Sequence, residues 1–301
     1  MTMINILRVS GHHYVALSLV IGAVMISFSG VWVELSHVTP TVSAFYRVFF
    51  GSIVLVAAAL FRREVLWHGK RHLLLGFICG ALFAVDLTFY HYSIIYVGPG
   101  LGTILPNFQV FILAMVGIYF FKEKVRVLLL ISIPLAFCGL FLIVGIDWGQ
   151  LGRLDKIGVY FGLAAAVCYA AFLLSLRKLQ GDQAGLTFFY VLMVVSVMAS
   201  AFLALEVFRT GDTLRIPDMQ SLFSLAALGL FSQVVGWILI TNALPKIQAS
   251  LSGFILLLQP ALAFVWDVLL FRRPTSLLNW AGVVIVLVAI YLGSIKPARA
   301  K

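Results

Sequence analysis

Charged residues are scarce in this chain, which has 11 Asp and Glu and 21 Lys and Arg among 301 residues. Hydrophobic residues account for 62% of it, which is more than a soluble domain needs for its core. The shortage of charge therefore excludes a soluble globular protein and predicts an all-α membrane protein. The basic excess lies at the ends of apolar runs rather than among exposed aromatic residues, so the expected partner is membrane lipid and not nucleic acid.

Cysteine and catalytic motifs are also scarce. The three cysteines, Cys79, Cys138 and Cys168, each lie inside an apolar run, which excludes a disulfide framework and a CxxC metal site. The chain contains no HExxH motif, no GxSxG motif and no cluster of carboxylates suited to hydrolysis or phosphate chemistry. We therefore expect no enzyme activity, no catalytic residue, no metal and no cofactor.

Long apolar runs are abundant, at about ten places, and each is long enough to cross a bilayer core of about 30 Å. The expected helices are residues 14–34, 41–61, 72–92, 101–121, 127–146, 157–176, 186–206, 219–243, 249–271 and 277–295. The connections between them are short, so no soluble domain is inserted.

Lys and Arg divide unequally between the two sides of such a bundle. With the N-terminus inside, 14 of them fall on inner segments and 6 on outer loops, and Arg47 lies inside a helix. The pair Arg272 and Arg273 falls outside. Because inner loops carry an excess of Lys and Arg, we predict a multi-pass protein of the cell inner (plasma) membrane with both termini in the cytoplasm.

The chain repeats itself at an offset of 150 residues. Phe121 aligns with Phe271, and no gap is needed from the third to the fifth helix of each half. Five helices per half is an odd number, so the two halves insert with opposite orientations, which is a transporter architecture. The sequence predicts two inverted five-helix repeats, residues 1–146 and 147–301, with chance similarity between apolar segments as the alternative.

The stretch from Tyr92 to Lys124 is interrupted by polar residues and a proline, and so is its counterpart from Ala249 to Pro274. Interrupted membrane helices at matched positions of two halves indicate a transport site. Each proline removes a backbone hydrogen bond, so Pro106 and Pro260 are candidate hinges, with a static kink as the alternative.

The residues described so far resemble the drug/metabolite transporter superfamily in its ten-helix EamA-type branch. Arg47, in the segment Ala44-Phe45-Tyr46-Arg47, resembles the arginine of that branch's second helix. The stretch 92–124 resembles its fourth helix, with Glu123 at the acidic position that ends it, and Pro260 matches its ninth helix. The resemblance covers nearly the whole chain and implies an inner-membrane carrier, commonly an exporter of amino acids or similar metabolites.

Arg47 and Asp86 are charges inside apolar helices, where burial is costly and function is the default interpretation. They lie at a similar depth and could neutralise each other, either as a structural bridge or as a substrate site. Phe83, Asp86, Leu87 and Tyr90 share one helix face, and the offset of 150 carries that face to Gln233 and Trp237. The candidate substrate-binding residues are Arg47, Asp86, Tyr90, Asn107, Gln109, Gln233, Trp237 and Gln259.

A carrier that exports a small metabolite, such as an amino acid, by alternating access is the favoured function. An intramembrane enzyme, a channel and a membrane bundle without transport are the alternatives. The fifth and tenth helices carry small residues at four-residue spacing, Ser132 with Ala136 and Ala289 with Gly293. Such spacing allows close helix approach, within one chain or across a homodimer, so these helices are expected away from the substrate path.

Overall fold

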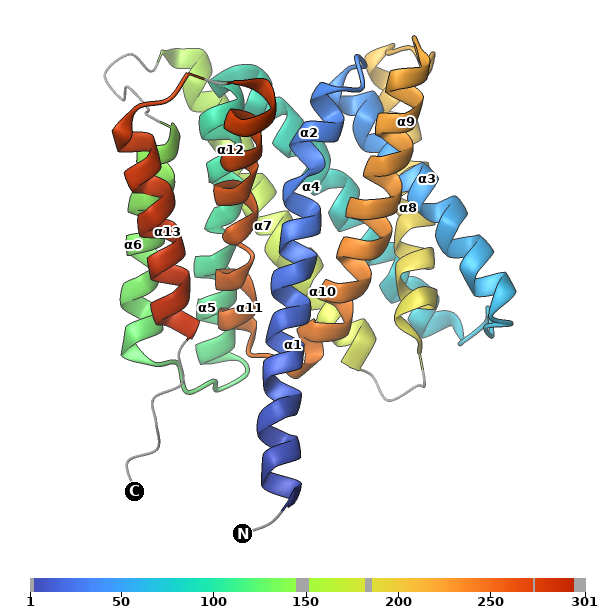
Figure 1. Cartoon of the computed structure of the whole chain (residues 1–301). Coiled ribbons are helices and arrows are strands. Elements are labelled where there is room, and N and C mark those ends of the chain that lie inside the picture. The colour runs from blue at the N-terminus through green and yellow to red at the C-terminus, as the bar shows by residue number, and fades with distance from the viewer. Residues whose placement is uncertain (1–2, 145–151, 182–185, 273, 295–301) are drawn as a thin grey trace.

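The chain folds into a bundle of helices in the computed structural model, which describes residues 3–144, 152–181, 186–272 and 274–294. Within those ranges the regular elements are all helical. Figure 1 shows most of them running between two ends of the molecule, with α1 beginning and α13 ending at the same end. The predicted repeat boundary at 146 and 147 and the predicted outer residue Arg273 lie outside the described residues.

The first half contains six α-helices and one 3-10 segment among the described residues. They are α1 (Met3–Ser27), α2 (Ser29–Glu34), α3 (Pro40–Phe61), α4 (Lys70–Ile104), η1 (Leu105–Phe108), α5 (Gln109–Tyr119) and α6 (Val127–Val144). The described part of the second half begins with α7 (Arg153–Gly181), α8 (Phe188–Thr210), α9 (Met219–Ala227) and the π-helical segment η3 (Leu228–Gly236). It continues with α10 (Trp237–Ala243), η4 (Leu244–Lys246), α11 (Ala249–Ile255), α12 (Leu258–Phe271) and α13 (Leu277–Ser294).

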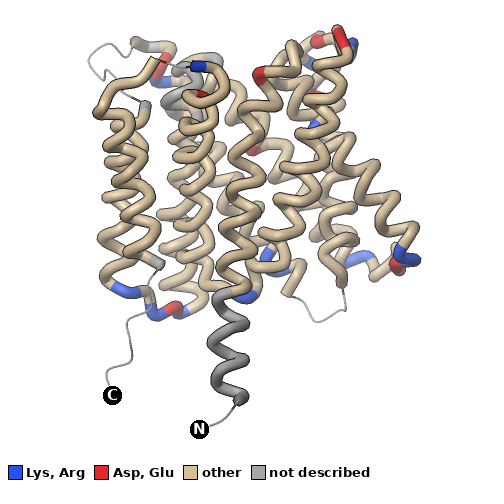
Figure 2. Tube along the Cα trace, in the orientation of Figure 1, with Lys and Arg blue, Asp and Glu red and all other residues tan. Residues whose placement is uncertain are grey.

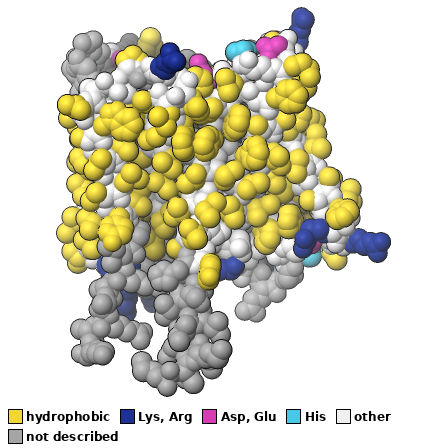
Figure 3. All heavy atoms as spheres, in the orientation of Figure 1, with side chains coloured by type: hydrophobic (Ala, Val, Ile, Leu, Met, Phe, Trp, Pro, Cys, Tyr) yellow, Lys and Arg dark blue, Asp and Glu magenta, His cyan; other side chains and the backbone are white. Residues whose placement is uncertain are grey.

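The helices are apolar on the outside as well as inside. Among the described residues, seven helical spans are long and apolar enough to cross a membrane, and shorter apolar helices cover Leu105–Tyr119, Val127–Ile143 and Leu277–Gly293. Hydrophobic side chains cover the visible face between the two ends (Figure 3), and most Lys, Arg, Asp and Glu residues lie near those ends (Figure 2). An apolar surface bounded by charge at both ends is that of a multi-pass membrane protein.

Local sequence signals explain where the helices start and stop. α3 begins with Pro40 at its first position, and the Thr39 hydroxyl accepts a bond from the Val42 amide at 3.4 Å. Thr187 caps α8 in the same way, at 3.1 Å from the Tyr190 amide. α8 ends at Thr210 and is followed by Gly211, whose φ of 74° lies in the left-handed region that favours glycine.

Several predicted boundaries differ from the structure. α7 extends the helix expected at 157–176 to Arg153 and Gly181, and α8 extends the helix expected at 186–206 to Thr210. The first helix was expected from residue 14, whereas α1 starts at Met3, because the polar residues before Tyr14 allow a helix even though they do not favour burial. The third and fourth helices were expected to be separated at 93–100, whereas helical structure continues to Ile104.

The chain nevertheless reverses direction within α4. A Cβ added to Gly102 would lie 3.0 Å from the backbone N and Cα of Ile94. Eight residues of straight helix would instead separate these positions by about 12 Å. The predicted turn therefore exists, and it is made with helical backbone.

Helices from the two halves pack in matched pairs. α6 packs against α13, α3 against α8, and α5 against α11, while α4 packs on α7 and α1 packs on η3 and α10. The contact between α6 and α13 is especially close, because a Cβ on Gly282 would lie 2.5 Å from the Gly139 carbonyl oxygen. Asn279 adds hydrogen bonds to the carbonyls of Leu142 and Ile143, at 3.0 and 2.9 Å.

The small residues predicted for close packing are used inside this chain. Ser132 and Ala136 on α6, and Ala289 on α13, are at most 1% exposed. Gly293 is also buried, and a Cβ there would collide with the ring of Phe254. These positions therefore serve packing within one chain.

Candidate functional site

Arg47 lies on α3 where that helix closely approaches η3. A Cβ on Gly229 would lie 2.8 Å from Cβ of Phe50 and 3.1 Å from the backbone nitrogen of Gly51. The absence of a side chain at Gly229 and Gly51 brings the two backbones together. As a result, Arg47 and Gln233, which are 186 positions apart in the chain, meet where α3 packs against η3.

The Arg47 guanidinium is held between a ring and an amide. Its Nε donates to Gln233 Oε1 at 3.2 Å, and its Cζ lies 5.9 Å from the centre of the Phe83 ring. Gln233 Nε2 in turn donates to Ser196 Oγ on α8 at 3.1 Å. Among the described residues, Arg47 makes no other side-chain hydrogen bond, so its two terminal nitrogens remain available.

Asp86 is the acidic residue that the sequence predicts as the partner of Arg47. It lies on α4 and is 7% exposed. The two charges interact electrostatically, yet no salt bridge joins them within the described part of the chain. Arg47 and Asp86, the predicted neutralising pair, therefore attract each other without direct contact between their charged groups. Opposite charges attract more strongly in a low-dielectric interior than in water, and here neither charge is neutralised by direct contact with the other.

Four aromatic rings pack beside these charges. Phe83 stacks on Phe172 of α7 at 4.7 Å, and Trp237 of α10 meets Phe83 and Phe172 edge-on at 5.5 and 5.1 Å. Tyr169 lies 6.5 Å from both Phe172 and Trp237. We call Phe83, Tyr169, Phe172 and Trp237 the ring cluster. It joins the predicted helix face that contains Phe83 to its counterpart at the offset of 150, which contains Trp237.

Two buried donors next to the ring cluster lack acceptors. Trp237 Nε1 and Gln259 Nε2 are buried and have no hydrogen-bond partner in the described structure. Gln259, on α12, lies close enough to the Tyr169 side chain to interact with it, but the geometry is not that of a hydrogen bond. Buried donors without acceptors are costly, and a ligand that brings an oxygen would satisfy them.

The structure brings together most of the predicted candidates. Trp237 belongs to the ring cluster, and Arg47, Asp86, Gln233 and Gln259 lie around it. Tyr90 is half-buried within electrostatic range of Arg47.

The two amides of the fourth predicted helix behave differently. Gln109 is fully buried, and its Nε2 donates to the Gly253 carbonyl of α11 at 3.2 Å. None of its described contacts reaches the ring cluster, because it faces the partner helix. Asn107 is half-buried in η1.

Both candidate hinge prolines lie at real interruptions of helices. Pro106 occupies the 3-10 segment between α4 and α5. Pro260 is the third residue of α12, just after the break that separates it from α11. A proline is tolerated near a helix start because its missing amide hydrogen has no partner to lose there.

Some contributors to this site carry no signal in the sequence. Ser196, Tyr169 and Phe172 lie in apolar runs that look like any other membrane helix. Only packing reveals that Ser196 bonds Gln233, that Phe172 stacks on Phe83, and that Tyr169 lies within electrostatic range of Arg47 and Asp86. The spacing of Tyr169 and Phe172, three residues apart on one helix face, is the single hint.

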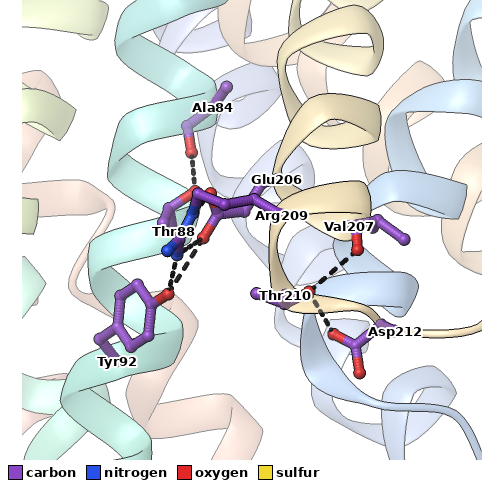
Figure 4. A network of polar contacts seen from close by, with 8 residues as sticks. All are labelled: Ala84, Thr88, Tyr92, Glu206, Val207, Arg209, Thr210 and Asp212. Carbon is purple, nitrogen blue, oxygen red and sulfur yellow. Dashed lines mark hydrogen bonds and ion pairs between the residues drawn. The ribbon is translucent and has the colours of Figure 1, made fainter.

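A second polar cluster lies where the C-terminal part of α8 meets α4, shortly before the turn within α4 (Figure 4). Glu206 accepts from Arg209 Nη2 at 2.6 Å and from the Tyr92 hydroxyl at 3.1 Å, and Arg209 also contacts that hydroxyl. Glu206 and Arg209 are one helical turn apart, so the acid neutralises the base locally and the cluster ties α4 to α8.

A third polar cluster joins three elements. Both carboxylate oxygens of Glu123 accept bonds from the start of α11, at 2.7 Å from the Ala249 amide and 2.9 Å from the Ser250 hydroxyl. Arg177 of α7 lies 3.8 Å away and over the ring of Phe121. The sequence marked Glu123 only as a helix end.

Comparisons with known proteins agree with this architecture. A model of the EamA-like transporter family matches the chain over residues 13–145 and again over residues 156–295. A protein of Clostridium kluyveri named "Uncharacterized transporter" is 25% identical over 225 residues, which cover 72% of this chain and 70% of that protein. A solved structure described as "Crystal structure of protein" superposes with a TM-score of 0.81 at 14% identity, over 93% of this chain and 98% of that one. At that identity the likeness is one of fold.

Proposed function

The chain belongs to the EamA-like transporter family, and from this premise we propose that it exports a small metabolite, such as an amino acid, across the cell inner membrane by alternating access. The observation that carries the substrate class is the separation of Arg47 from Asp86. An arginine cannot shed its charge, and here its terminal nitrogens have no partner among the described residues. A substrate carboxylate fits that open edge, because guanidinium binds carboxylates through two parallel hydrogen bonds.

The rest of the site fits the remainder of an amino acid. Asp86 offers a buried carboxylate to an ammonium group, and the ring cluster offers apolar and aromatic surface to a side chain. Trp237 Nε1 and Gln259 Nε2 offer two further donors for the carboxylate. A zwitterion satisfies both charges at once, which an anion or a cation alone does not.

Two inverted five-helix repeats would supply the alternating access. The separate matches of the family model to the two halves support such repeats, as does the packing of α6 on α13, α3 on α8 and α5 on α11. In that arrangement the site lies between the repeats, so a rocking motion would expose it to one side and then to the other.

Uptake and counterflow in proteoliposomes test this proposal. A panel of labelled amino acids is offered to the wild type, to Arg47→Ala and to Asp86→Asn. Arg47→Ala abolishes transport, and Asp86→Asn reduces proton-coupled transport more than exchange of substrate for substrate. Counterflow distinguishes a carrier from a channel.

Arg62→Ala is the matched control, because Arg62 is exposed at the end of the same helix and lies over a ring, that of Phe189. It leaves transport near the wild-type rate. Full transport by the double variant Arg47→Ala/Asp86→Asn would show that the two charges act only as a structural bridge. It would contradict the proposal that Arg47 binds the substrate.

A further inference from the structure

Gln233 was expected to contact the substrate, but its contacts assign it a different role. We infer that Gln233 is a positioning residue: its amide holds Arg47 by Nε, so that the terminal nitrogens stay free for the substrate carboxylate. This inference rests on the proposed function for the identity of the ligand. The orientation of Arg47 itself is a property of the protein alone and is testable without a substrate.

Both ends of the Gln233 amide are fixed. Oε1 accepts from Arg47 Nε at 3.2 Å, and Nε2 donates to Ser196 Oγ at 3.1 Å. Gln233 is 1% exposed and Ser196 is fully buried, so water does not compete for either bond. An amide has one acceptor end and one donor end. Because a guanidinium can only donate, the acceptor end must face Arg47, and the Ser196 hydroxyl then accepts from the donor end.

The backbone around Gln233 is unusual in a way that serves this contact. Gln233 lies within η3, a π-helical segment of nine residues. π-Helical turns are rare in proteins, and those that occur are often found at functional sites. Opposite it, Gly51 leaves room for the side chain, because a Cβ there would lie 2.5 Å from Gln233 Cγ. A wide helical turn on one element and a missing side chain on the other both accommodate the amide.

The Arg47 guanidinium contacts two residues that occupy equivalent positions in the internal repeat. Gln233 is the partner of Phe83 at the offset of 150, and Arg47 lies over the ring of one and is bonded to the amide of the other. The ring supports the face of the guanidinium, while the amide fixes its rotation in that plane.

Without the amide, Arg47 has a strong alternative partner. Asp86 is buried and already attracts it, so a guanidinium released at Nε turns toward Asp86 and forms a closed ion pair. The terminal nitrogens are then occupied, and the substrate must break a buried salt bridge in order to bind. The neutral amide thus keeps the two charges apart.

The first experiment needs no substrate. Phenylglyoxal reacts with the terminal nitrogens of arginine, and mass spectrometry measures its rate at Arg47, with the exposed Arg62 as internal standard. In Gln233→Leu the rate at Arg47 falls several-fold relative to Arg62, and adding Asp86→Asn restores it. An unchanged rate in Gln233→Leu would overturn the inference.

The second experiment measures ligand affinity with two probes that differ in one group. L-phenylalanine carries the carboxylate, and phenethylamine lacks it but keeps the ring and the ammonium. Gln233→Leu weakens L-phenylalanine about tenfold, the scale of one hydrogen bond to a charged group, and leaves phenethylamine unchanged. Equal weakening of both probes would mean that Gln233 only maintains the fold.

Gln180→Leu is the matched control, because the Gln180 amide is half-buried and bonded to the Leu186 carbonyl at the far end of α7. It leaves the ratio of the two affinities unchanged. If neither probe binds the wild type while the phenylglyoxal result holds, the proposed substrate class fails and the role of Gln233 stands.

Discussion

At the scale of single residues, Asp218 fixes the start of α9. Its Oδ1 accepts from the Ser221 amide at 2.7 Å, and its Oδ2 lies 3.1 Å from His37 Nδ1, in the loop before α3. The bond from the Ser221 amide, and then the contact with His37, hold the pKa of the Asp218 carboxyl below its ordinary value. One side chain therefore both caps a helix and joins two loops.

We expect that bond to make stability depend on pH. The folded-state pKa of Asp218 is depressed, so its contribution is present above the unfolded value of about 3.9 and is lost as the pH falls through the lower folded value. Thermal unfolding in detergent measures this. Asp218→Ala lowers the melting temperature at pH 7, and the difference from wild type shrinks as the pH falls below 4.

Asp218→Asn separates capping from charge, because asparagine also caps helices well. It retains most of the stability at pH 7 and has the flatter pH profile. A wild-type profile as flat as that of Asp218→Asn would contradict the role of the carboxylate.

The residues that sequence reasoning found are those whose chemistry conflicts with their surroundings. Arg47 and Asp86 are visible because a charge inside an apolar run is costly, and Gln233 and Trp237 follow from the repeat. Tyrosine and serine are common in apolar helices, so nothing in the local sequence distinguishes Tyr169 and Ser196. Their importance arises from α7 and α8 packing against helices encoded far away in the chain, which a single sequence does not specify.

At the scale of elements, one carboxylate organises the contact between α5 and α11. Glu123 follows α5 and accepts bonds from the first residues of α11, whose amides lack partners within their own helix. Its side chain is 7% exposed, so water cannot replace the carboxylate easily. The start of α11 is therefore built on a residue of the other half.

We expect Glu123→Ala to destabilise the protein by at least about 2 kcal/mol, because buried amides lose a charged acceptor. Hydrogen exchange at the peptide containing Ala249 and Ser250 accelerates, while exchange in α8 stays the same. Lys124→Ala, an exposed change one residue away, is the control. Slow exchange at Ala249 and Ser250 in Glu123→Ala would show that α11 is held by packing alone.

A second prediction concerns the pairing of α6 and α13. Gly282 faces the Gly139 carbonyl and the Ile143 amide, with a Cβ expected at 2.5 and 2.8 Å from these backbone atoms. Backbone cannot move aside as a flexible side chain can, so Gly282→Ala separates the helices and costs about 1–3 kcal/mol.

The melting temperature in detergent checks this cost. Gly30→Ala is the control, since nothing lies within 4 Å of a Cβ built there. Equal melting temperatures for Gly282→Ala and the wild type would mean that the close approach is not maintained in the protein.

Element boundaries were predictable wherever the sequence contains a strong stop. Helix α3 ends within a residue or two of its expected limits because Pro40 and the arginines after Phe61 mark them. The fourth helix was less predictable: glycine and proline at 98–102 indicate a turn, but they do not say that the turn keeps helical backbone. Hydrogen-bond pattern inside a turn depends on the packing around it, not on composition.

At the scale of the whole molecule, the packing of helices between the two halves is reciprocal. Where α4 of the first half packs on α7 of the second, η3 and α10 of the second pack on α1 of the first. The repeat at offset 150 predicted related halves, but it could not predict which helices would touch. Pairing is decided by small residues such as Gly139 and Gly282, whose value is apparent only when the opposite backbone is in place.

The last prediction concerns which side of the molecule faces the cytoplasm. α1 begins and α13 ends at one end of the bundle (Figure 1), and with that end inside, 14 Lys and Arg lie on inner segments against 6 outside. We therefore expect Trp67, before α4, to face the cytoplasm and Arg215, before α9, to face outward, and both side chains are exposed. In a background with Cys79, Cys138 and Cys168 replaced by alanine, a membrane-impermeant maleimide on intact cells labels Arg215→Cys and spares Trp67→Cys. Permeabilised cells provide the control, because both variants are then labelled. Labelling of Trp67→Cys alone in intact cells would contradict the predicted orientation.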